Sequence, residues 1–172
     1  MDIKNISSKY DVRYLNSDNV DEILNVMREN TLFYKYTDSK PTKEEIINDM
    51  SITPPGIDIS KKHYIGFYEL NELIAIMDLI DGYPSIDVAY VGLFMINSKY
   101  HGRGIGSTII HDLEVYLKNI GKKSIQLAVD KGNPQSTGFW QKNGFVVFDE
   151  VKKGNYIKLK AVKKLWYIVK PF

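Results

Sequence analysis

YVGLFMINSKYHGRGIGSTIIHDLEVYLKNI, residues 90–120, is the stretch on which the interpretation of the whole chain depends. Its first part is apolar and β-prone, its middle is basic and rich in glycine, and its last part has the apolar period of a helix. A strand that passes through a glycine loop straight into a helix presents unpaired backbone N–H groups and the positive end of a helix dipole at one point. The stretch therefore predicts a site for a phosphate-bearing ligand.

Length and composition indicate an ordinary globular protein. A chain of 172 residues fits one domain, 1–172, with a sizeable core. Its 44% hydrophobic and 26% charged residues are typical of globular proteins. A net charge of +2 is too small to favour nucleic acid as a partner, so any cation used in binding must be placed locally, as in the HGRG segment.

The residue types and segments that are missing bear on chemistry and location. The chain has no cysteine, which removes thiol nucleophiles, disulfides and cysteine-bound metals, and suits a reducing compartment. No apolar run approaches the roughly 20 residues of a membrane span. The polar start, MDIKNISSKYD, does not resemble a signal peptide. We therefore expect a cytoplasmic protein without a membrane partner.

The residues before the opening stretch predict a strand, two helices and a β-hairpin. Residues 10–15 alternate weakly and indicate an edge strand. Asn19 and Glu22 have the spacing of a capping box that opens one helix, and Thr42 and Glu45 have the same spacing before a second. The hairpin consists of two β-rich runs joined by a short polar turn, residues 63–69 and 73–80.

The stretch itself and the residues after it complete the predicted sheet. Residues 86–96 are apolar on both faces, which indicates a central strand, and Gly92 marks a bulge or a close approach within it. A helix follows the glycine loop, and Asn133 caps a second, short one. The remaining strands are expected at 124–129, 145–150 and 164–169. This order predicts an α/β fold of the α+β type, a mixed and mainly antiparallel sheet of about seven strands with helices on both faces.

Two common glycine-loop motifs do not fit these residues. A P-loop requires Gly-Lys followed by Ser or Thr, and the chain has no such segment. A dinucleotide fingerprint requires a third glycine three residues after the second, but Gly102-x-Gly104 is followed there by Ser107. Such a fingerprint also belongs early in a βαβ unit, whereas this loop follows predicted antiparallel strands. The predicted phosphate site is therefore of another type.

Two segments of the chain resemble signatures of the GNAT superfamily of N-acetyltransferases. The first, residues 96–106, reads INSKYHGRGIG and is similar to the acyl-CoA signature Gln/Arg-x-x-Gly-x-Gly/Ala. The second, residues 133–145, reads NPQSTGFWQKNGF and is similar to the family's Asn…Phe-Trp/Tyr…Gly-Phe segment. Their spacing and the order of elements also agree, so the resemblance covers essentially the whole chain. It implies a GNAT-type fold with a splay between the two central strands, acetyl-CoA as co-substrate and no metal.

The resemblance also implies where the cofactor binds. Pantetheine would lie in the gap beside the splayed strand, and the diphosphate would bind backbone N–H groups of the glycine loop. Asn133 is either a plain helix cap or a further cofactor contact, and the two roles are compatible. The cofactor contacts expected on this basis are Phe94, Met95, Ile96, His101, Gly102, Arg103, Gly104, Ile105, Gly106, Ser107, Asn133 and Phe139.

The chain departs from the family's usual catalytic pattern, in which a carboxylate on the central strand acts as base and a tyrosine in the last helix acts as acid. Tyr90 stands at the carboxylate position, and Trp140, which cannot release a proton near neutral pH, stands at the tyrosine position. Of the nearby carboxylates Asp78, Asp81 and Asp87, Asp78 is the candidate base because it is expected to be half-buried. A structural role for Asp78 is the competing interpretation, and Tyr90 is either a catalytic group or a pocket wall.

Histidines and aromatic residues outside these segments allow further expectations. His63, His101 and His111 do not have the spacing of metal ligands, so no metal site is expected. The aromatic segment 33–36, FYKY, lies in the connection that borders the acceptor in GNAT-type folds. It is either an aromatic wall of the acceptor pocket or part of the core.

These residues together predict an acetyl-CoA-dependent N-acetyltransferase that acts on a primary amine by direct attack on the thioester. The acceptor is a small-molecule amine or a protein amine, and the residues do not distinguish them. The alternative is a non-catalytic acyl-CoA-binding or regulatory module, which the unusual residues at the two catalytic positions would suit. A homodimer is compatible with either function.

Overall fold

Seven strands form one sheet in the order β1-β2-β3-β4-β5-β7-β6. The structure, a computed structural model, describes residues 1–36 and 40–165. The pair β4–β5 is parallel and the other neighbouring pairs are antiparallel, so the predicted mixed sheet is confirmed. The strands are β1 (Asp11–Tyr14), β2 (Lys62–Glu69), β3 (Glu72–Asp81), β4 (Val88–Ile96), β5 (Ser124–Asp130), β6 (Val146–Lys153) and β7 (Tyr156–Lys164).

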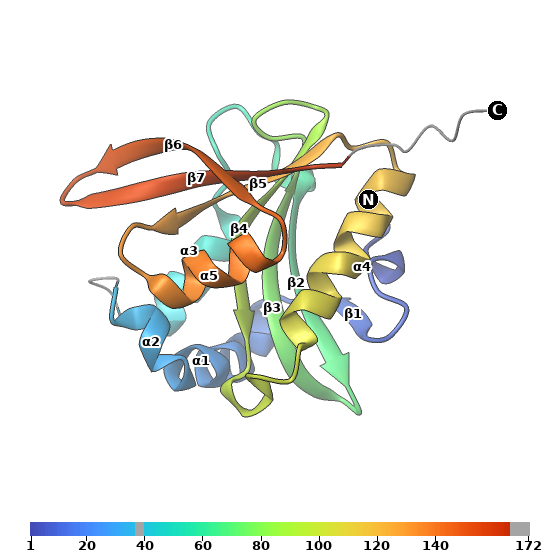
Figure 1. Ribbon diagram of the computed structural model, residues 1–172. Helices are drawn as coiled ribbons and strands as arrows, with labels where there is room; N and C mark the ends of the chain where they lie inside the picture. The colour runs from blue at the N-terminus through green and yellow to red at the C-terminus, as the bar shows by residue number, and fades with distance from the viewer. Residues whose placement is uncertain (37–39, 166–172) are drawn as a thin grey trace.

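Helices cover both faces of this sheet, with α4 on one face and α1 and α3 on the other (Figure 1). The α-helices are α1 (Val20–Glu29), α2 (Thr31–Tyr34), α3 (Lys43–Ser51), α4 (Ile105–Asn119) and α5 (Pro134–Lys142). Short 3₁₀ turns precede or join them, η1 (Ile3–Asn5), η2 (Ser17–Asn19), η3 (Ile59–Lys61) and η4 (Ser98–Tyr100).

One of the two predicted capping boxes is observed and the other is displaced. Thr42 and Glu45 cap α3 reciprocally, as predicted, because each side chain accepts from the other residue's backbone N–H. The expected box of Asn19 and Glu22 is wrong. The chain enters α1 through η2, and Asn16 forms the box with Asn19 one turn earlier. Asn19 makes no side-chain cap bond to α1.

The end of the sheet also differs from the prediction. Residues 164–169 were expected to form the last strand, but β7 ends at Lys164, and residues 166–169 lie outside the described part. The observed strand begins at Tyr156, just after a turn in which Gly154 has a φ of +61°. Lysines alternate with Ile157 and Leu159 along β7, and this charge hid the strand pattern. β6 and β7 form a long hairpin that extends from the body of the molecule (Figure 1).

Two hydrophobic clusters, one on each face of the sheet, form the core. Alternation along β2 assigns Ile65 and Phe67 to the α4 face and Tyr64 and Tyr68 to the α1–α3 face. The α4-face cluster also receives Trp140 from α5. Because β2, β3 and β4 are apolar on both faces, the two clusters hold these central strands firmly from either side.

A bulge in β4 marks the point where the two central strands separate. Asp78 of β3 pairs with Leu93 and Leu79 pairs with Val91, so Gly92 is the extra residue. The β4–β5 pairing ends at Val91. Beyond it, β4 continues against β3, while β5 continues against β7. The predicted bulge at Gly92 and the predicted splay between the central strands are both confirmed.

Candidate active site

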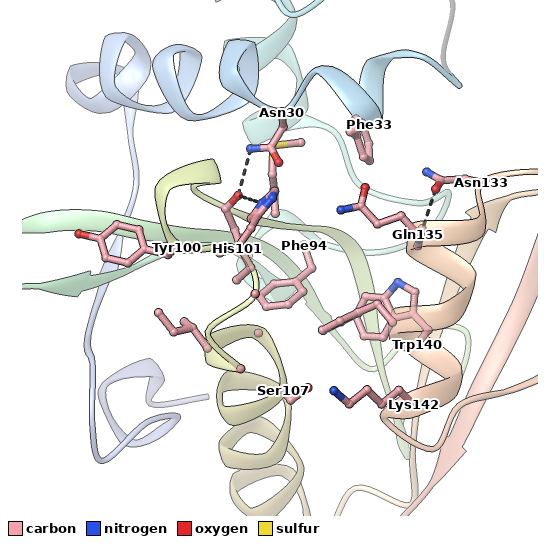
Figure 2. Close-up of a pocket in the computed structure, with 18 residues that line it drawn as sticks. Asn30, Phe33, Phe94, Tyr100, His101, Ser107, Asn133, Gln135, Trp140 and Lys142 are labelled. Carbon is pink, nitrogen blue, oxygen red and sulfur yellow. Dashed lines mark hydrogen bonds between the residues drawn. The ribbon is translucent and has the colours of Figure 1, made fainter.

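A cavity of about 320 Å³ lies between the separated end of β4, the start of α4 and one side of α5 (Figure 2). Most of the predicted cofactor contacts line it. They are Phe94, Met95, Ile96, His101, Gly102, Gly104, Ile105, Gly106, Ser107, Asn133 and Phe139. Further lining residues that the sequence prediction did not include are Asn30, Phe33, Tyr100, Gln135, Ser136, Trp140 and Lys142. Residues that are 100 positions apart in the sequence therefore meet around one opening.

The free edge of β4 faces this cavity. The N–H of Asn97 donates to the carbonyl of Ile74 on β3 (2.9 Å). In an antiparallel pair, successive residues alternate in direction, so Phe94 and Ile96 direct their N–H and C=O groups away from β3. With β5 no longer paired there, these groups, except the Ile96 carbonyl described next, are available to an extended ligand.

One of these groups already has two partners. The Ile96 carbonyl accepts a hydrogen bond from Asn30 Nδ2 (3.0 Å) and another from His101 Nε2 (3.0 Å), as Figure 2 shows. Because a carbonyl only accepts, His101 must carry its proton on Nε2. Asn30 also donates to the Val26 carbonyl (2.8 Å), so its buried amide joins the end of α1 to the end of β4.

The glycine loop presents free donors at the other end of the cavity. Gly102 and Gly104 both have a φ of +75°, a left-handed conformation that favours glycine. The first intrahelical bond of α4 runs from Thr108 N–H to the Gly104 carbonyl, so the preceding N–H groups of the first turn have no helical partner. Gly106 brings α4 close to α5, because a Cβ there would lie 2.9 Å from Phe139 Cε2. The helix start therefore presents free N–H groups at the place where an anion site was predicted.

The Arg103 side chain lies elsewhere than the sequence suggested. Its guanidinium stacks over the Tyr100 ring, 5.4 Å from the centroid, and Arg103 does not line the cavity. The Tyr100 hydroxyl in turn donates to Glu72 (2.6 Å). The attraction between the cation and the ring favours this position of the guanidinium.

Asn133 and Trp140 form the α5 wall of the cavity. Asn133 Oδ1 accepts from the Ser136 N–H (3.0 Å), so the helix-cap role is observed, and its amide nitrogen remains directed away from the cap (Figure 2). Trp140 is buried and packs edge-on against Phe139 (5.0 Å) and Phe145 (4.9 Å). The residue at the family's usual tyrosine position is therefore part of an aromatic cluster.

Asp78 lies beside the bulge, on the α1–α3 face, and does not line the cavity. Its Oδ2 accepts a hydrogen bond from the Lys62 ammonium (2.7 Å), and both side chains are buried, at 13% and 4% exposure. A Cβ on Gly92 would lie 2.7 Å from this Oδ2. The carboxylate thus occupies the space that the missing side chain of the bulge residue leaves open.

The surroundings of Asp78 favour its protonated form more than water does. Burial raises the pKa of Asp78; the hydrogen bond from Lys62 opposes the rise without cancelling it, and the charge of Asp49 on α3 adds to it. Asp78 Oδ1 and the hydroxyl of Tyr64, its partner across the strands, are both buried, and no described residue hydrogen-bonds to either. Two paired residues of β2 and β3 therefore each carry a buried polar atom with unused hydrogen-bonding capacity.

Tyr90 and the aromatic segment surround this region. Tyr90 lies on the same face of the sheet as Asp78 and packs edge-on against Tyr83 (5.2 Å). Burial, followed by the neighbouring Tyr83 and Asp78, raises its pKa, so Tyr90 stays protonated near neutral pH. Phe33 lines the cavity and contacts the Tyr34 ring edge-on (5.0 Å). Burial raises the pKa of Tyr34 to about 12.

Several of these residues are not singled out by the sequence, for different reasons. Lys62 could have been found, since the predicted hairpin brings residue 62 close to residue 78 across its turn. Asn30, Gln135 and Lys142 had no recognisable signal, because each reaches the cavity only through the packing of separate helices.

Within residues 1–36 and 40–165, no three His, Cys, Asp or Glu side chains are grouped so that they could hold a metal ion. None of the helices in these two ranges has the length and apolar character that crossing a membrane requires.

The cavity begins between two separating strands and ends at the free N–H groups of a helix, a shape that would suit a ligand with an extended arm and a phosphate group. Comparison with known families agrees. Residues 23–145 match the model described as the acetyltransferase (GNAT) family. The chain belongs to the GNAT acetyltransferase family. The predictions of this family and of an enzyme of the acyltransferase class are therefore confirmed.

Solved structures show the same fold at low identity. An acetyltransferase from Thermus thermophilus is 21% identical with a TM-score of 0.73, and the match covers 91% of this chain and 97% of that one. The PaiA N-acetyltransferase from Thermoplasma acidophilum, solved with coenzyme A, is 21% identical with a TM-score of 0.63, covering 88% and 97%. An N-acetyltransferase from Staphylococcus aureus is 17% identical with a TM-score of 0.63, covering 92% and 100%. Among curated protein sequences, none matches this chain significantly.

Proposed function

We propose that this protein transfers the acetyl group of acetyl-CoA to a primary amine, which is a small molecule or an amine of another protein. The observation that carries the proposal is the continuous cavity from the free edge of β4 to the start of α4. Its volume, about 320 Å³, suits the pantetheine arm, and the adenosine end of the cofactor would lie outside it.

The cofactor is proposed to bind in two ways along this cavity. Backbone groups of Phe94 and Ile96 pair with the amides of pantetheine, as one strand pairs with another. The N–H groups at the start of α4, from Ile105 to Ser107, bind the diphosphate, and each bond to a charged oxygen contributes roughly 1.5–3 kcal/mol. The free amide nitrogen of Asn133 supplies a further donor to the arm.

The proposed reaction is a direct transfer. A neutral amine nitrogen attacks the thioester carbonyl carbon, and the carbon–nitrogen bond forms as the carbonyl oxygen becomes negative. The C–S bond then breaks and the thiolate of coenzyme A leaves, while the nitrogen loses its extra proton to a base. Backbone N–H groups next to the Gly92 bulge stabilise the negative oxygen. The thiolate takes its proton from solvent, since Trp140 has no acidic proton to offer.

Asp78 is the proposed base. Its carboxylate lies against the bulge where the two central strands separate, and its Oδ1 has no hydrogen-bond partner among the described residues. That oxygen accepts the amine's proton directly or through one water molecule. A raised pKa brings the carboxyl closer to neutral pH and makes it a stronger base than an ordinary aspartate. Tyr90, on the same face, is proposed as a wall of the acceptor pocket that stays protonated.

Turnover with a panel of amines tests this proposal. Release of coenzyme A is followed with a thiol-reactive dye, which has no background from a chain without cysteine. The panel contains polyamines, amino acids, aminoglycosides and peptides with a free N-terminus. The expected result is saturable release that depends on one class of amine. Tight coenzyme A binding without release for any amine would instead indicate a non-catalytic binding module.

The location of the cofactor site has its own test. Gly104→Glu adds a negative charge at the start of α4, where the diphosphate is proposed to bind, and is expected to abolish measurable affinity for coenzyme A. Gly121→Glu is the matched control, since Gly121 follows the other end of α4, also has a positive φ (+86°), and has open space around its Cβ position. Equal affinities of the two variants would contradict the proposed location.

A further inference from the structure

Few positive groups surround the cavity. Of its lining residues, His101 and Lys142 are the ones whose side chains can carry a positive charge. The His101 ring is occupied by its hydrogen bond to the Ile96 carbonyl. Arg103, the cation that the glycine-loop sequence brings to mind, is stacked on Tyr100 outside the cavity. A negatively charged ligand in the cavity therefore meets one available cationic side chain, Lys142.

Lys142 is the last residue of α5 and faces the glycine loop from the opposite wall. Figure 2 shows its ammonium directed toward Ser107, in the first turn of α4. No carboxylate of the described residues is paired with Lys142, although many other lysines of the chain form such pairs. An exposed, unpaired ammonium thus points across the opening at the free N–H groups of a helix start.

Both groups attract the same kind of ligand. The first turn of α4 offers backbone donors and the positive end of a helix dipole, and the ammonium of Lys142 offers a charge on the other side. Two positive groups facing each other across a gap would repel, unless an anion lies between them. An elongated anion with several oxygens satisfies both at once.

We propose that Lys142 binds the diphosphate of coenzyme A from the wall opposite the glycine loop, so that the diphosphate is held between α4 and α5. This assignment rests on the proposed function, because it takes coenzyme A as the ligand. Under this assignment the cationic side chain that recognises the diphosphate is Lys142, at the end of α5, and not Arg103 of the glycine loop. Lys142 is then a binding residue and has no part in proton transfer.

Three ligands separate this assignment from other effects of a substitution. Coenzyme A carries the diphosphate and a 3′-phosphate, dephospho-coenzyme A carries the diphosphate alone, and pantetheine carries neither. Their dissociation constants are measured with the full chain by calorimetry or by competition. Lys142→Glu is compared with Lys152→Glu, which makes the same charge change at an exposed position of β6 outside the cavity.

We expect affinity to fall only for the ligands that carry the diphosphate. Lys142→Gln weakens binding of coenzyme A about fivefold, as expected for one exposed charge pair, and Lys142→Glu weakens it about 25-fold. Dephospho-coenzyme A shows the same losses, whereas pantetheine binds all variants alike. Lys152→Glu changes no affinity by more than about twofold. In 1 M salt the difference between the wild-type chain and Lys142→Gln disappears.

Several outcomes would overturn the assignment. Unchanged affinity of both Lys142 variants for coenzyme A would remove the residue from the site, and an equal loss for pantetheine would show that the variants damage the cavity itself. A loss seen with coenzyme A but not with dephospho-coenzyme A would assign Lys142 to the 3′-phosphate instead. A wild-type chain that bound no coenzyme A would refute the proposed function as well, whereas normal turnover by Lys142→Glu at low acetyl-CoA would refute this inference alone.

Discussion

Two aspartates on β3, Asp78 and Asp81, each pair with a buried lysine, yet their pKa values shift in opposite directions. Asp78 pairs with Lys62, and Asp81, at the end of the strand, pairs with Lys122. The carboxylate side chains have nearly equal solvent exposure, at 13% and 14%. Burial raises the pKa of both, and in both cases the lysine opposes it, but the net shift is upward for Asp78 and downward for Asp81.

Two causes act in the same direction. The protein encloses Asp78 more deeply than Asp81, so burial raises the pKa of Asp78 more, and the next nearest charges add to this difference. Asp49 lies near Asp78 and adds a negative charge, whereas Lys61 and the N-terminal amine lie near Asp81 and add positive ones. Lys122 is further fixed by donating to the Ile86 carbonyl (2.7 Å). The Asp81–Lys122 pair is therefore assigned a structural role at the end of β3. Asp78, in the other pair, is the candidate proton acceptor beside the bulge.

Replacing each lysine is expected to give the largest difference between the Asp78–Lys62 and Asp81–Lys122 pairs. Lys62→Met leaves Asp78 buried without a counter-charge, which is expected to lower the free energy of unfolding by about 3 kcal/mol at pH 8. Loss of Lys62 raises the pKa of Asp78 further, so the carboxyl becomes protonated as pH falls, and the destabilisation shrinks at pH 5. Lys122→Met is expected to cost about 1–2 kcal/mol, since Lys61 and the N-terminal amine remain near Asp81. Denaturant unfolding at both pH values measures this, and identical losses for the two variants would remove the contrast.

Removing each carboxylate tests function. Asp78→Asn cannot accept a proton and is expected to lower kcat about 100-fold, the lower end of what a general base contributes. Asp81→Asn also loses a buried ion pair but is expected to change kcat less than about twofold. Steady-state kinetics on both variants, with affinity for coenzyme A as the measure of an intact site, decides the matter. Normal kcat for Asp78→Asn would leave that residue as a purely structural one.

A glycine substitution tests whether the bulge positions Asp78. The added methyl group of Gly92→Ala would lie 2.7 Å from Asp78 Oδ2, so the carboxylate must move. A shift of this kind is expected to lower kcat about tenfold while coenzyme A still binds. Gly138→Ala, in α5, meets no atom within 4 Å and serves as the control with unchanged kcat. Equal kcat values for Gly92→Ala and the control would show that the position of Asp78 does not matter.

The smallest expected effect concerns the distant charges. If Asp78 is the base, as proposed, its ionised form is the active one, so the rate is expected to fall as pH falls through its pKa, which lies above the ordinary 3.8. Asp49→Asn removes a charge that raises this pKa, and the acid limb of the pH–rate profile is expected to move to lower pH. Lys61→Gln should instead raise the pKa of Asp81, which nuclear magnetic resonance can follow. An acid limb that Asp49→Asn left in place would show that Asp49 has no influence on the reacting group.

The features of the molecule that could be predicted depend on short stretches of consecutive residues. The bulge, the glycine loop and the cap of α5 depend on Gly92, on Gly102 and Gly104, and on Asn133, whose local conformations are dictated by residue type. The resemblance to the family signatures led to two more predictions, acetyl-CoA as the co-substrate and the separation of the two central strands. The cavity-lining residues found by sequence lie almost entirely in these segments.

The parts that could not be predicted depend on packing between distant segments. The sequence does not show that the Arg103 side chain packs on the Tyr100 ring, a contact that forms only in the folded loop. Lys142 looked like an ordinary helix end until α5 was placed against α4. The opposite pKa shifts of Asp78 and Asp81 depend on how deeply each is buried and on charges such as Asp49 and Lys61, and no local sequence pattern shows either.

The two hydrogen bonds to the Ile96 carbonyl have a consequence for the proposed binding of the cofactor. Asn30 and His101 already donate to this carbonyl, so Ile96 offers only its backbone N–H to a ligand that pairs with β4. A pantetheine arm that pairs with β4 would therefore place an amide N–H at the Phe94 carbonyl. A shift in register toward the glycine loop would bring that N–H to the Ile96 carbonyl, which is already occupied. In the proposed complex the thioester carbonyl carbon would then lie at a fixed distance from the bulge, and Asn30 at the end of α1 and His101 of the glycine loop would together set the register of the cofactor.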